Sequence, residues 1–207
     1  MHPRCVRFKH GGVAAHATMP VDAEMTLDDL GQRICILGPS NSGKSSLAAA
    51  IERARGLPAI HLDQLRNLPN TAWVPRPDAE FITLHDAAIA GERWVMDGNY
   101  SRLMPQRLAR ATGVIVLDLT TCRSLWRYIR RSLFERDRIG GLEGGLESVN
   151  WDMLHHIAVA TPPRSKRQAA LLDSLDLPGI RLSTPKALAT FYRSEGLTRQ
   201  QRTMRST

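Results

Sequence analysis

The residues with the clearest chemical potential are the run G-P-S-N-S-G-K-S at positions 38–45, which fits the pattern G-x-x-x-x-G-K-[ST]. Glycines in such a loop let the backbone curl so that its N–H groups point at phosphate oxygens, and the following helix N-terminus adds partial positive charge. Lys44 can reach the β- and γ-phosphates, and the Ser45 hydroxyl can ligate Mg²⁺. The run therefore predicts a site for ATP and Mg²⁺, with these candidate nucleotide contacts: Gly38, Ser40, Asn41, Ser42, Gly43, Lys44, Ser45 and Ser46.

A P-loop needs a buried strand before it and a helix after it, and the flanking sequence supplies both. Residues 33–37 are predicted to form the strand, and a helix is predicted from about residue 43 to residue 55. Gly56 is suited to cap the C-terminus of that helix, and Pro58 blocks its continuation. This context favours phosphate binding over the alternative of a Gly/Ser-rich turn that only caps a helix.

Beyond the P-loop, short β-rich runs alternate with helical stretches, which is typical of an α/β fold with a parallel sheet. Further strands are predicted at 59–62, 93–97, 113–118 and 179–182. Further helices are predicted at 77–90, 122–134 and 147–174, and a last one begins at Thr184 and Pro185.

Asp63 follows the strand predicted at 59–62. Ligands of a parallel sheet lie outside the carboxyl ends of its strands, so Asp63 is expected beside the P-loop. There it could accept a hydrogen bond from a phosphoryl acceptor or act as a base. The alternative is a helix N-cap.

Asp97 ends the strand predicted at 93–97, and Gly98, Asn99 and Tyr100 follow it. We expect Asp97 to hold Mg²⁺ through water, and Asn99 and Tyr100 to line an acceptor site. The structural alternative is a plain Asp-Gly turn.

Several arginines recur at three- and four-residue spacing in the predicted helix 122–134, so they share one face. They are Arg123, Arg127, Arg130 and Arg131. Such stacked charges repel one another unless an anion compensates them, and the charge of a phosphoryl-transfer transition state is one such anion. We therefore predict an Arg-rich lid at about residues 123–146. The alternatives are pairing with nearby carboxylates, simple solvation, or a phosphate-tracking patch for nucleic acid.

The chain has 207 residues, which suits one domain with a small lid, and a formal net charge of +8, which favours anionic partners. Its three cysteines lie far apart, and no apolar run approaches the length of a membrane helix. We expect a reduced, cytoplasmic protein without a membrane partner, as a monomer or homodimer. Residues 1–30 are predicted to be a disordered extension, 31–196 the folded domain, and 197–207 a basic flexible tail. Translation could start at Met19 or Met25.

Four segments in this order resemble the adenylate-kinase-like P-loop family: G-P-S-N-S-G-K-S-S-L-A, H-L-D, W-V-M-D-G-N-Y, and V-I-V-L-D with its Arg-rich helix. The resemblance covers about residues 33–195 and is nearest to small bacterial P-loop proteins described as DNA topology modulation proteins. It implies a three-layer fold with a five-stranded parallel sheet in the order 2-3-1-4-5.

Compared with adenylate kinase, the segment at 63–66 is similar to the acceptor-phosphate segment, which implies that Arg66 binds phosphate. Arg102 and Gln106 resemble the residues that hold the AMP phosphate and read adenine, and Arg127 and Arg131 fall where lid arginines stand. The sequence N-Y-S at 99–101 departs from the usual Phe-Pro, and the lid lacks its usual hairpin signature, so the acceptor stays open.

These patterns predict a kinase that transfers the ATP γ-phosphoryl group to a nucleoside monophosphate, a nucleoside or another small acceptor. Lys44, Asp63, Asp97, Arg127 and Arg131 are its predicted catalytic residues. The predicted acceptor pocket consists of Asp63, Arg66, Asn99, Tyr100, Arg102 and Gln106. One alternative is an ATPase that binds DNA, which the positive charge favours and the aromatic content of 5% disfavours. The other is a nucleotide sensor without turnover.

Overall fold

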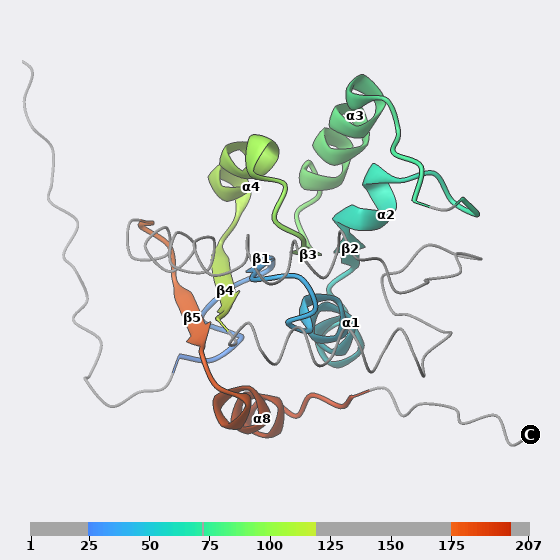
Figure 1. The fold of residues 1–207 in the computed structure, drawn as a ribbon. Helices are drawn as coiled ribbons and strands as arrows, with labels where there is room; N and C mark the ends of the chain where they lie inside the picture. Colours follow the sequence, from blue (N-terminus) through green and yellow to red (C-terminus); the bar gives the residue numbers. More distant parts are fainter. Residues whose placement is uncertain (1–24, 72, 119–174, 200–207) are drawn as a thin grey trace, which may run out of the picture.

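A computed structural model describes residues 25–71, 73–118 and 175–199 (Figure 1). Its centre is a five-stranded sheet in the order β2-β3-β1-β4-β5, in which every neighbouring pair is parallel. The strands are β1 (Arg33–Leu37), β2 (Ala59–His61), β3 (Trp94–Asp97), β4 (Gly113–Leu117) and β5 (Gly179–Leu182). The predicted α/β fold class and strand order are confirmed.

Helices cover both faces of the sheet, which gives three layers (Figure 1). α1 (Lys44–Arg55) and α8 (Pro185–Ser194) pack on one face, where their apolar residues join one core cluster. α3 (Asp78–Ile89) and α4 (Met104–Arg110) lie on the other face, over a second cluster. No helix in the described ranges is long and apolar enough to cross a membrane.

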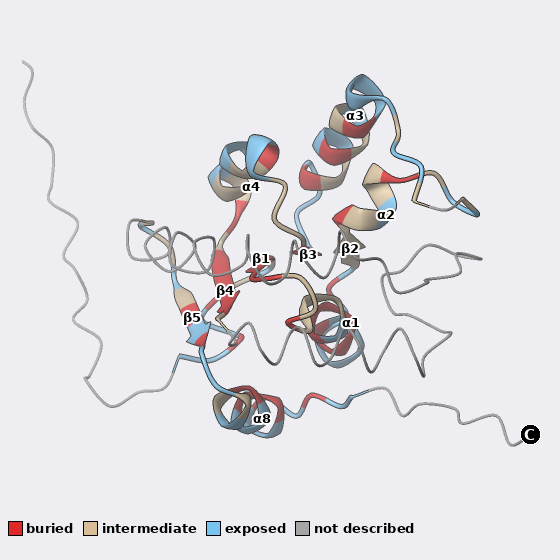
Figure 2. Ribbon diagram, in the orientation of Figure 1, coloured by how far each residue is buried: buried red, intermediate tan, exposed pale blue. Residues whose placement is uncertain are grey.

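Burial on both faces explains why the central strands are apolar runs without alternation (Figure 2). All residues of β3 and β4 are buried, as are four of the five residues of β1. The edge strand β5 instead alternates, and its Arg181 is exposed. Each apolar side chain removed from water in these layers contributes about 1.5–3 kcal/mol to stability.

Two predicted helix ends are confirmed. Gly56 follows α1 with a φ of 62°, and its N–H donates to the carbonyl of Glu52. Thr184 precedes α8, and its hydroxyl accepts a hydrogen bond from the backbone N–H of Ala187 at 3.0 Å.

The boundaries of other elements differ from the prediction by one residue. β2 ends at His61 rather than at residue 62, because Leu62 already begins the short helix α2 (Leu62–Arg66). β3 begins at Trp94, β4 ends at Leu117, and α3 spans Asp78–Ile89 instead of 77–90. α2, α4 and the 3₁₀ turn η1 (Ser101–Leu103) were not predicted. The helices predicted at 122–134 and 147–174, and with them the lid, lie outside the described residues.

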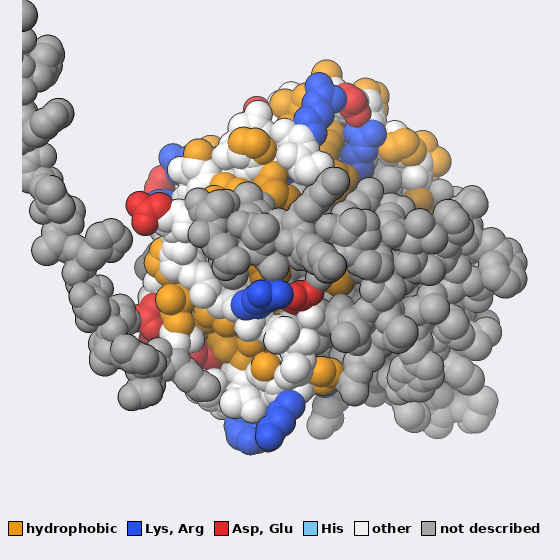
Figure 3. Space-filling model, turned by 60° about the vertical axis from the view of Figure 1, so that its left-hand side comes forward, with side chains coloured by type: hydrophobic (Ala, Val, Ile, Leu, Met, Phe, Trp, Pro, Cys, Tyr) orange, Lys and Arg blue, Asp and Glu red, His pale blue; other side chains and the backbone are white. Residues whose placement is uncertain are grey.

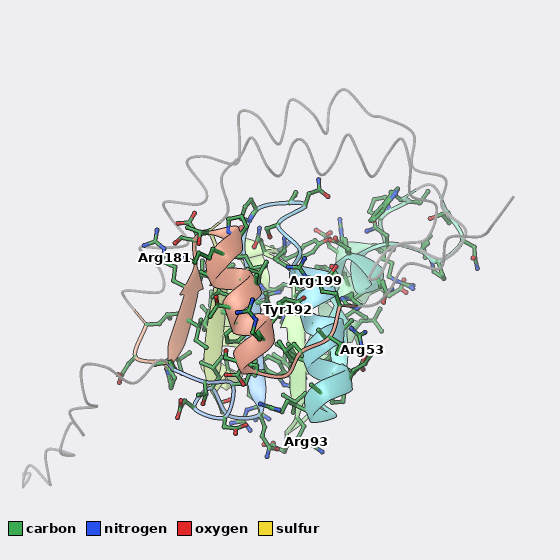
Figure 4. The ribbon with its side chains drawn as sticks, turned by 90° about the horizontal axis from the view of Figure 1, so that it is seen from below. Arg53, Arg93, Arg181, Tyr192 and Arg199 are labelled. Carbon is green, nitrogen blue, oxygen red and sulfur yellow. The ribbon has the colours of Figure 1, made fainter. Side chains whose placement is uncertain are left out.

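The predicted folded domain, residues 31–196, leaves out core residues at both of its ends. Leu27 and Leu30 are buried in the cluster beneath α1 and α8, so residues 26–30 belong to the fold and not to a disordered extension. Leu197 is buried in the same cluster, and its N–H donates to the carbonyl of Tyr192. Arg199 lies over the ring of Tyr192 at 5.0 Å, on the face seen in Figure 4. The described part of the fold therefore includes residues 26–30 and 197–199.

Candidate functional site

The P-loop joins the end of β1 to the start of α1 (Figure 1). A Cβ on Gly38 would meet the carbonyl oxygen of Leu117 at 2.6 Å, so only glycine fits between this loop and β4. Asn41 and Gly43 both have positive φ, at 62° and 99°, which gives the backbone the curl that the motif predicts. The residues predicted to contact a nucleotide thus lie in one loop and the first turn of α1.

Lys44 and Ser45 open α1. The Lys44 Nζ donates to the carbonyl oxygen of Pro39 at 2.7 Å, across the loop itself. The Ser45 Oγ donates to the Oδ2 atom of Asp97 at 2.6 Å. The structure therefore brings together the two residues that the sequence proposes for Mg²⁺.

The same carboxylate has a second contact that the sequence analysis missed. His61 ends β2, opposite Asp97 in the register of β2 and β3, and its Nδ1 lies 2.6 Å from the Oδ1 atom of Asp97. The side chains of His61 and Asp97 are 11% and 6% exposed. Burial raises the pKa of Asp97, but the hydrogen bonds from His61 and Ser45 and the charge of Lys44 outweigh it and hold this pKa below its usual range. A histidine at the end of the strand next to Asp97 was the available signal.

The loop after β3 is held to the P-loop. The side-chain amide of Asn99 donates to the carbonyl of Gly38 at 2.9 Å and accepts from the N–H of Gly38 at 3.2 Å. This differs from its predicted place in the acceptor pocket, because both polar atoms of the amide contact the Gly38 backbone. The Asn99 carbonyl in turn accepts a hydrogen bond of 2.5 Å from the guanidinium of Arg107, a residue of α4 that is 1% exposed and was not singled out from the sequence.

Gly98 is required at the start of this loop. Its φ is 126°, and a Cβ there would meet the Cβ of Leu62 at 2.9 Å. The loop therefore packs closely on the first residue of α2, which brings the segment after β3 next to Asp63.

Asp63 lies inside α2 and does not cap it, so the N-cap alternative is wrong. Its Oδ1 atom accepts a hydrogen bond of 2.7 Å from the Tyr100 hydroxyl. Burial, followed by the charge of Asp63 and this hydrogen bond, raises the pKa of Tyr100, which keeps the hydroxyl protonated as a donor. The Tyr100 ring lies 5.2 Å from that of Phe81 on α3.

Two predicted acceptor residues converge on Asp78 in the first turn of α3. Arg66 donates to its Oδ1 atom at 2.7 Å and Arg102 to its Oδ2 atom at 3.1 Å. The hydrogen bond from Arg66 is the main reason that the pKa of Asp78 is lowered. Arg66 also lies over the ring of Phe81 at 5.4 Å.

The structure thus brings Asp63, Arg66, Tyr100 and Arg102 to one region at α2 and α3. Gln106 lies exposed on α4. Arg127 and Arg131 lie outside the described residues.

The donor set beside the P-loop suits Mg²⁺, because a hydroxyl and a carboxylate supply the oxygen ligands that this cation prefers. Ser45 and Asp97 are the donors that the sequence predicts for Mg²⁺, and the Ser45 Oγ lies 2.6 Å from the Asp97 Oδ2. Within the described residues there is no cluster of three or more His, Cys, Asp or Glu side chains that could hold a metal by itself.

No protein-family model and no curated protein matches this chain. Solved structures do resemble it. A gluconokinase from Sinorhizobium meliloti 1021 aligns with 80% of this chain and 90% of its own, at 17% identity and a TM-score of 0.47. A sugar kinase from Janibacter sp. HTCC2649 aligns over 80% and 93%, at 16% identity and a TM-score of 0.42. A shikimate kinase from Aquifex aeolicus VF5 aligns over 79% and 96%, at 14% identity and a TM-score of 0.43. Likenesses this remote do not indicate what the chain acts on.

Proposed function

We propose that this protein is a P-loop phosphotransferase that moves the γ-phosphoryl group of ATP to the hydroxyl or phosphate of a small acceptor. One observation carries the proposal: consecutive residues after β3 contact two different clusters. Asn99 bonds to Gly38 of the P-loop, and Tyr100 bonds to Asp63 of the second cluster. A phosphate-binding loop and a separate set of carboxylate and guanidinium groups therefore adjoin at the carboxyl edge of the sheet, as a donor site and an acceptor site must.

In the donor half, the P-loop amides and Lys44 hold the phosphates, and Ser45 directly and Asp97 through water would hold Mg²⁺. Bound Mg²⁺ supplies charge neutralisation on the phosphates. The contact between Lys44 and Pro39 is replaced when the ammonium group turns to a phosphate oxygen.

In the acceptor half, the oxygen of the acceptor hydroxyl bonds to the γ-phosphorus, and Asp63 accepts the proton of that hydroxyl. At the same time the bond between the γ-phosphorus and the β–γ bridging oxygen breaks. ADP is the leaving group. Tyr100 orients Asp63 through the bond of 2.7 Å. Arg66 and Arg102 bind polar groups of the acceptor. The proposal also includes a nucleoside monophosphate or a nucleoside as the acceptor, as in adenylate-kinase-like proteins. It further includes Arg127 and Arg131 as the residues that neutralise the charge of the phosphoryl group during transfer.

A role on DNA finds less support in the described surface. The net charge of +8 favours it. However, many arginines in the described ranges are paired with carboxylates, including Arg33 with Glu92 and Arg181 with Asp118. On the face in Figure 3, the Lys and Arg side chains lie in separate groups. The described residues on that face do not form the continuous basic surface that a duplex requires.

The test is transfer of γ-labelled phosphate from Mg·ATP to a panel of nucleosides, nucleoside monophosphates and small hydroxy compounds. The control is Lys44→Ala, which removes the ammonium group but leaves the fold. We expect label on one acceptor class with the native chain and none with the variant. Free phosphate that rises when DNA is added indicates the ATPase instead. Tight ATP binding without turnover across the panel indicates the sensor and contradicts the kinase.

A further inference from the structure

A partly buried histidine lies against the carboxylate that faces the P-loop. His61 is the last residue of β2, and the parallel register places it directly beside Asp97, the last residue of β3. Little of either side chain reaches solvent, at 11% and 6% exposure. The pair therefore lies largely out of solvent at the carboxyl ends of two neighbouring strands.

The direction of the hydrogen bond follows from the chemistry of the two groups. An ionised carboxylate only accepts, so the Nδ1 of His61 must carry the hydrogen that it donates to Oδ1 over 2.6 Å. This holds for either charge state of the ring. A bond to a carboxylate is among the stronger hydrogen bonds in proteins.

The other oxygen of Asp97 is fixed from the opposite side. Ser45 donates to Oδ2 over 2.6 Å, so each carboxylate oxygen has one short contact from a different element. Two such contacts determine the rotation of the carboxylate about its Cβ–Cγ bond, whereas one contact leaves it able to turn. Replacement of a residue that holds a metal ligand in this way commonly lowers metal affinity by about 10- to 100-fold.

We infer that His61 is a positioning residue, which sets the Asp97 carboxylate so that Ser45 directly, and Asp97 through water, would hold the cation that accompanies a nucleotide. The inference rests on the proposed function, since it assumes that Mg²⁺ binds beside the P-loop. It predicts that loss of the His61 hydrogen bond weakens the Mg²⁺-dependent part of nucleotide binding and leaves the P-loop's own contribution intact.

The test compares two isosteric replacements. His61→Asn retains an amide N–H at the place of Nδ1, whereas His61→Leu has the same shape as asparagine without a donor. The readout is the affinity for a non-hydrolysable ATP analogue, measured by calorimetry with Mg²⁺ and with EDTA. Thermal melting of each variant checks folding, and His61→Ala replaces the leucine variant if leucine does not fold.

With EDTA, we expect both variants to bind the analogue as the native chain does. With Mg²⁺, we expect the native chain and His61→Asn to gain affinity alike, and His61→Leu to lose at least about tenfold of that gain. A structural role alone would weaken binding equally with and without Mg²⁺.

The inference is overturned if His61→Leu keeps the full gain, if His61→Asn loses it as well, or if the native chain shows no gain. Failure of the proposed function is seen separately, as absence of phosphoryl transfer by the native chain. The expected split between asparagine and leucine in binding, together with no transfer to any acceptor, would support His61 as a positioning residue and reject the kinase.

Discussion

Replacement of Asn99 by leucine should loosen the P-loop, because the amide of Asn99 makes two hydrogen bonds to the buried backbone of Gly38. Leucine has nearly the shape of asparagine but neither donor nor acceptor. A hydrogen bond contributes about 0.5–1.5 kcal/mol net, so the two together contribute about 1–3 kcal/mol. The Gly38 N–H and carbonyl then lack these partners inside the protein, which puts the loss toward the upper end of that range.

Urea unfolding at neutral pH measures the loss in unfolding free energy. The melting temperature should fall by about 2–4 °C for each kcal/mol lost by a domain of this size. Affinity for an ATP analogue should fall about tenfold or more, since the loop must be ordered before it binds phosphate. Asn99→Asp is the matched control, because it retains an acceptor for the Gly38 N–H but places a carboxylate against the Gly38 carbonyl.

Two results would refute the reasoning. The first is a leucine variant within about 0.5 kcal/mol of the native stability and with unchanged nucleotide affinity. The second is a rise in the KM of the acceptor alone, which would restore Asn99 to the acceptor pocket where the sequence analysis placed it.

Three further changes address the rest of the site. Gly98→Ala should destabilise the fold by about 1–3 kcal/mol in urea unfolding, because its φ is 126° and the Cβ meets Leu62 at 2.9 Å; equal stability contradicts the close packing of the loop. Tyr100→Phe should lower kcat about tenfold and leave ATP-analogue affinity unchanged, since only the bond to Asp63 is lost; the reverse pattern contradicts its place in the acceptor half. The pKa of Asp97 is lowered in the fold, so its ionised form stabilises the protein above the unfolded value of 3.8, and this contribution disappears as the pH falls through the folded pKa. The unfolding free energy of Asp97→Asn should therefore fall less steeply with pH below about pH 4 than that of the native chain. An unchanged pH dependence in this range would contradict the lowered pKa of Asp97.

The elements that the sequence predicted well are those whose signals are local. β1 and β4 are runs of buried β-branched and aliphatic residues, and Gly56 and Thr184 end or begin helices by contacts within four residues. The short helix α4 has only seven residues, and its Arg107 is buried by a contact with the loop after β3. Periodicity does not reveal a helix of two turns that presents an arginine to the interior.

The site divides in the same way. Ser45 and Asp97 could be paired from sequence because a strand end and a P-loop are both recognisable. The role of His61 depends on the register between β2 and β3, and this register cannot be predicted from the sequence of two residues that are 36 positions apart. Asn99 was predicted to line the acceptor pocket, whereas its amide contacts the Gly38 backbone, and the direction of that amide depends on how closely Gly38 approaches, which is a tertiary property.

The short segment after β3 explains why the two halves of the site cannot be adjusted independently. Gly98 packs on Leu62, Asn99 forms hydrogen bonds to Gly38, and Tyr100 forms a hydrogen bond to Asp63. Three consecutive residues therefore contact α2, the P-loop and the proposed acceptor half in turn. Arg107 fixes the carbonyl in the middle of this segment from a buried position. In the proposed phosphotransferase, we therefore expect any movement that tightens the P-loop on phosphates to act on the backbone that carries Tyr100, which would couple nucleotide binding to the geometry of Asp63 through a single stretch of chain.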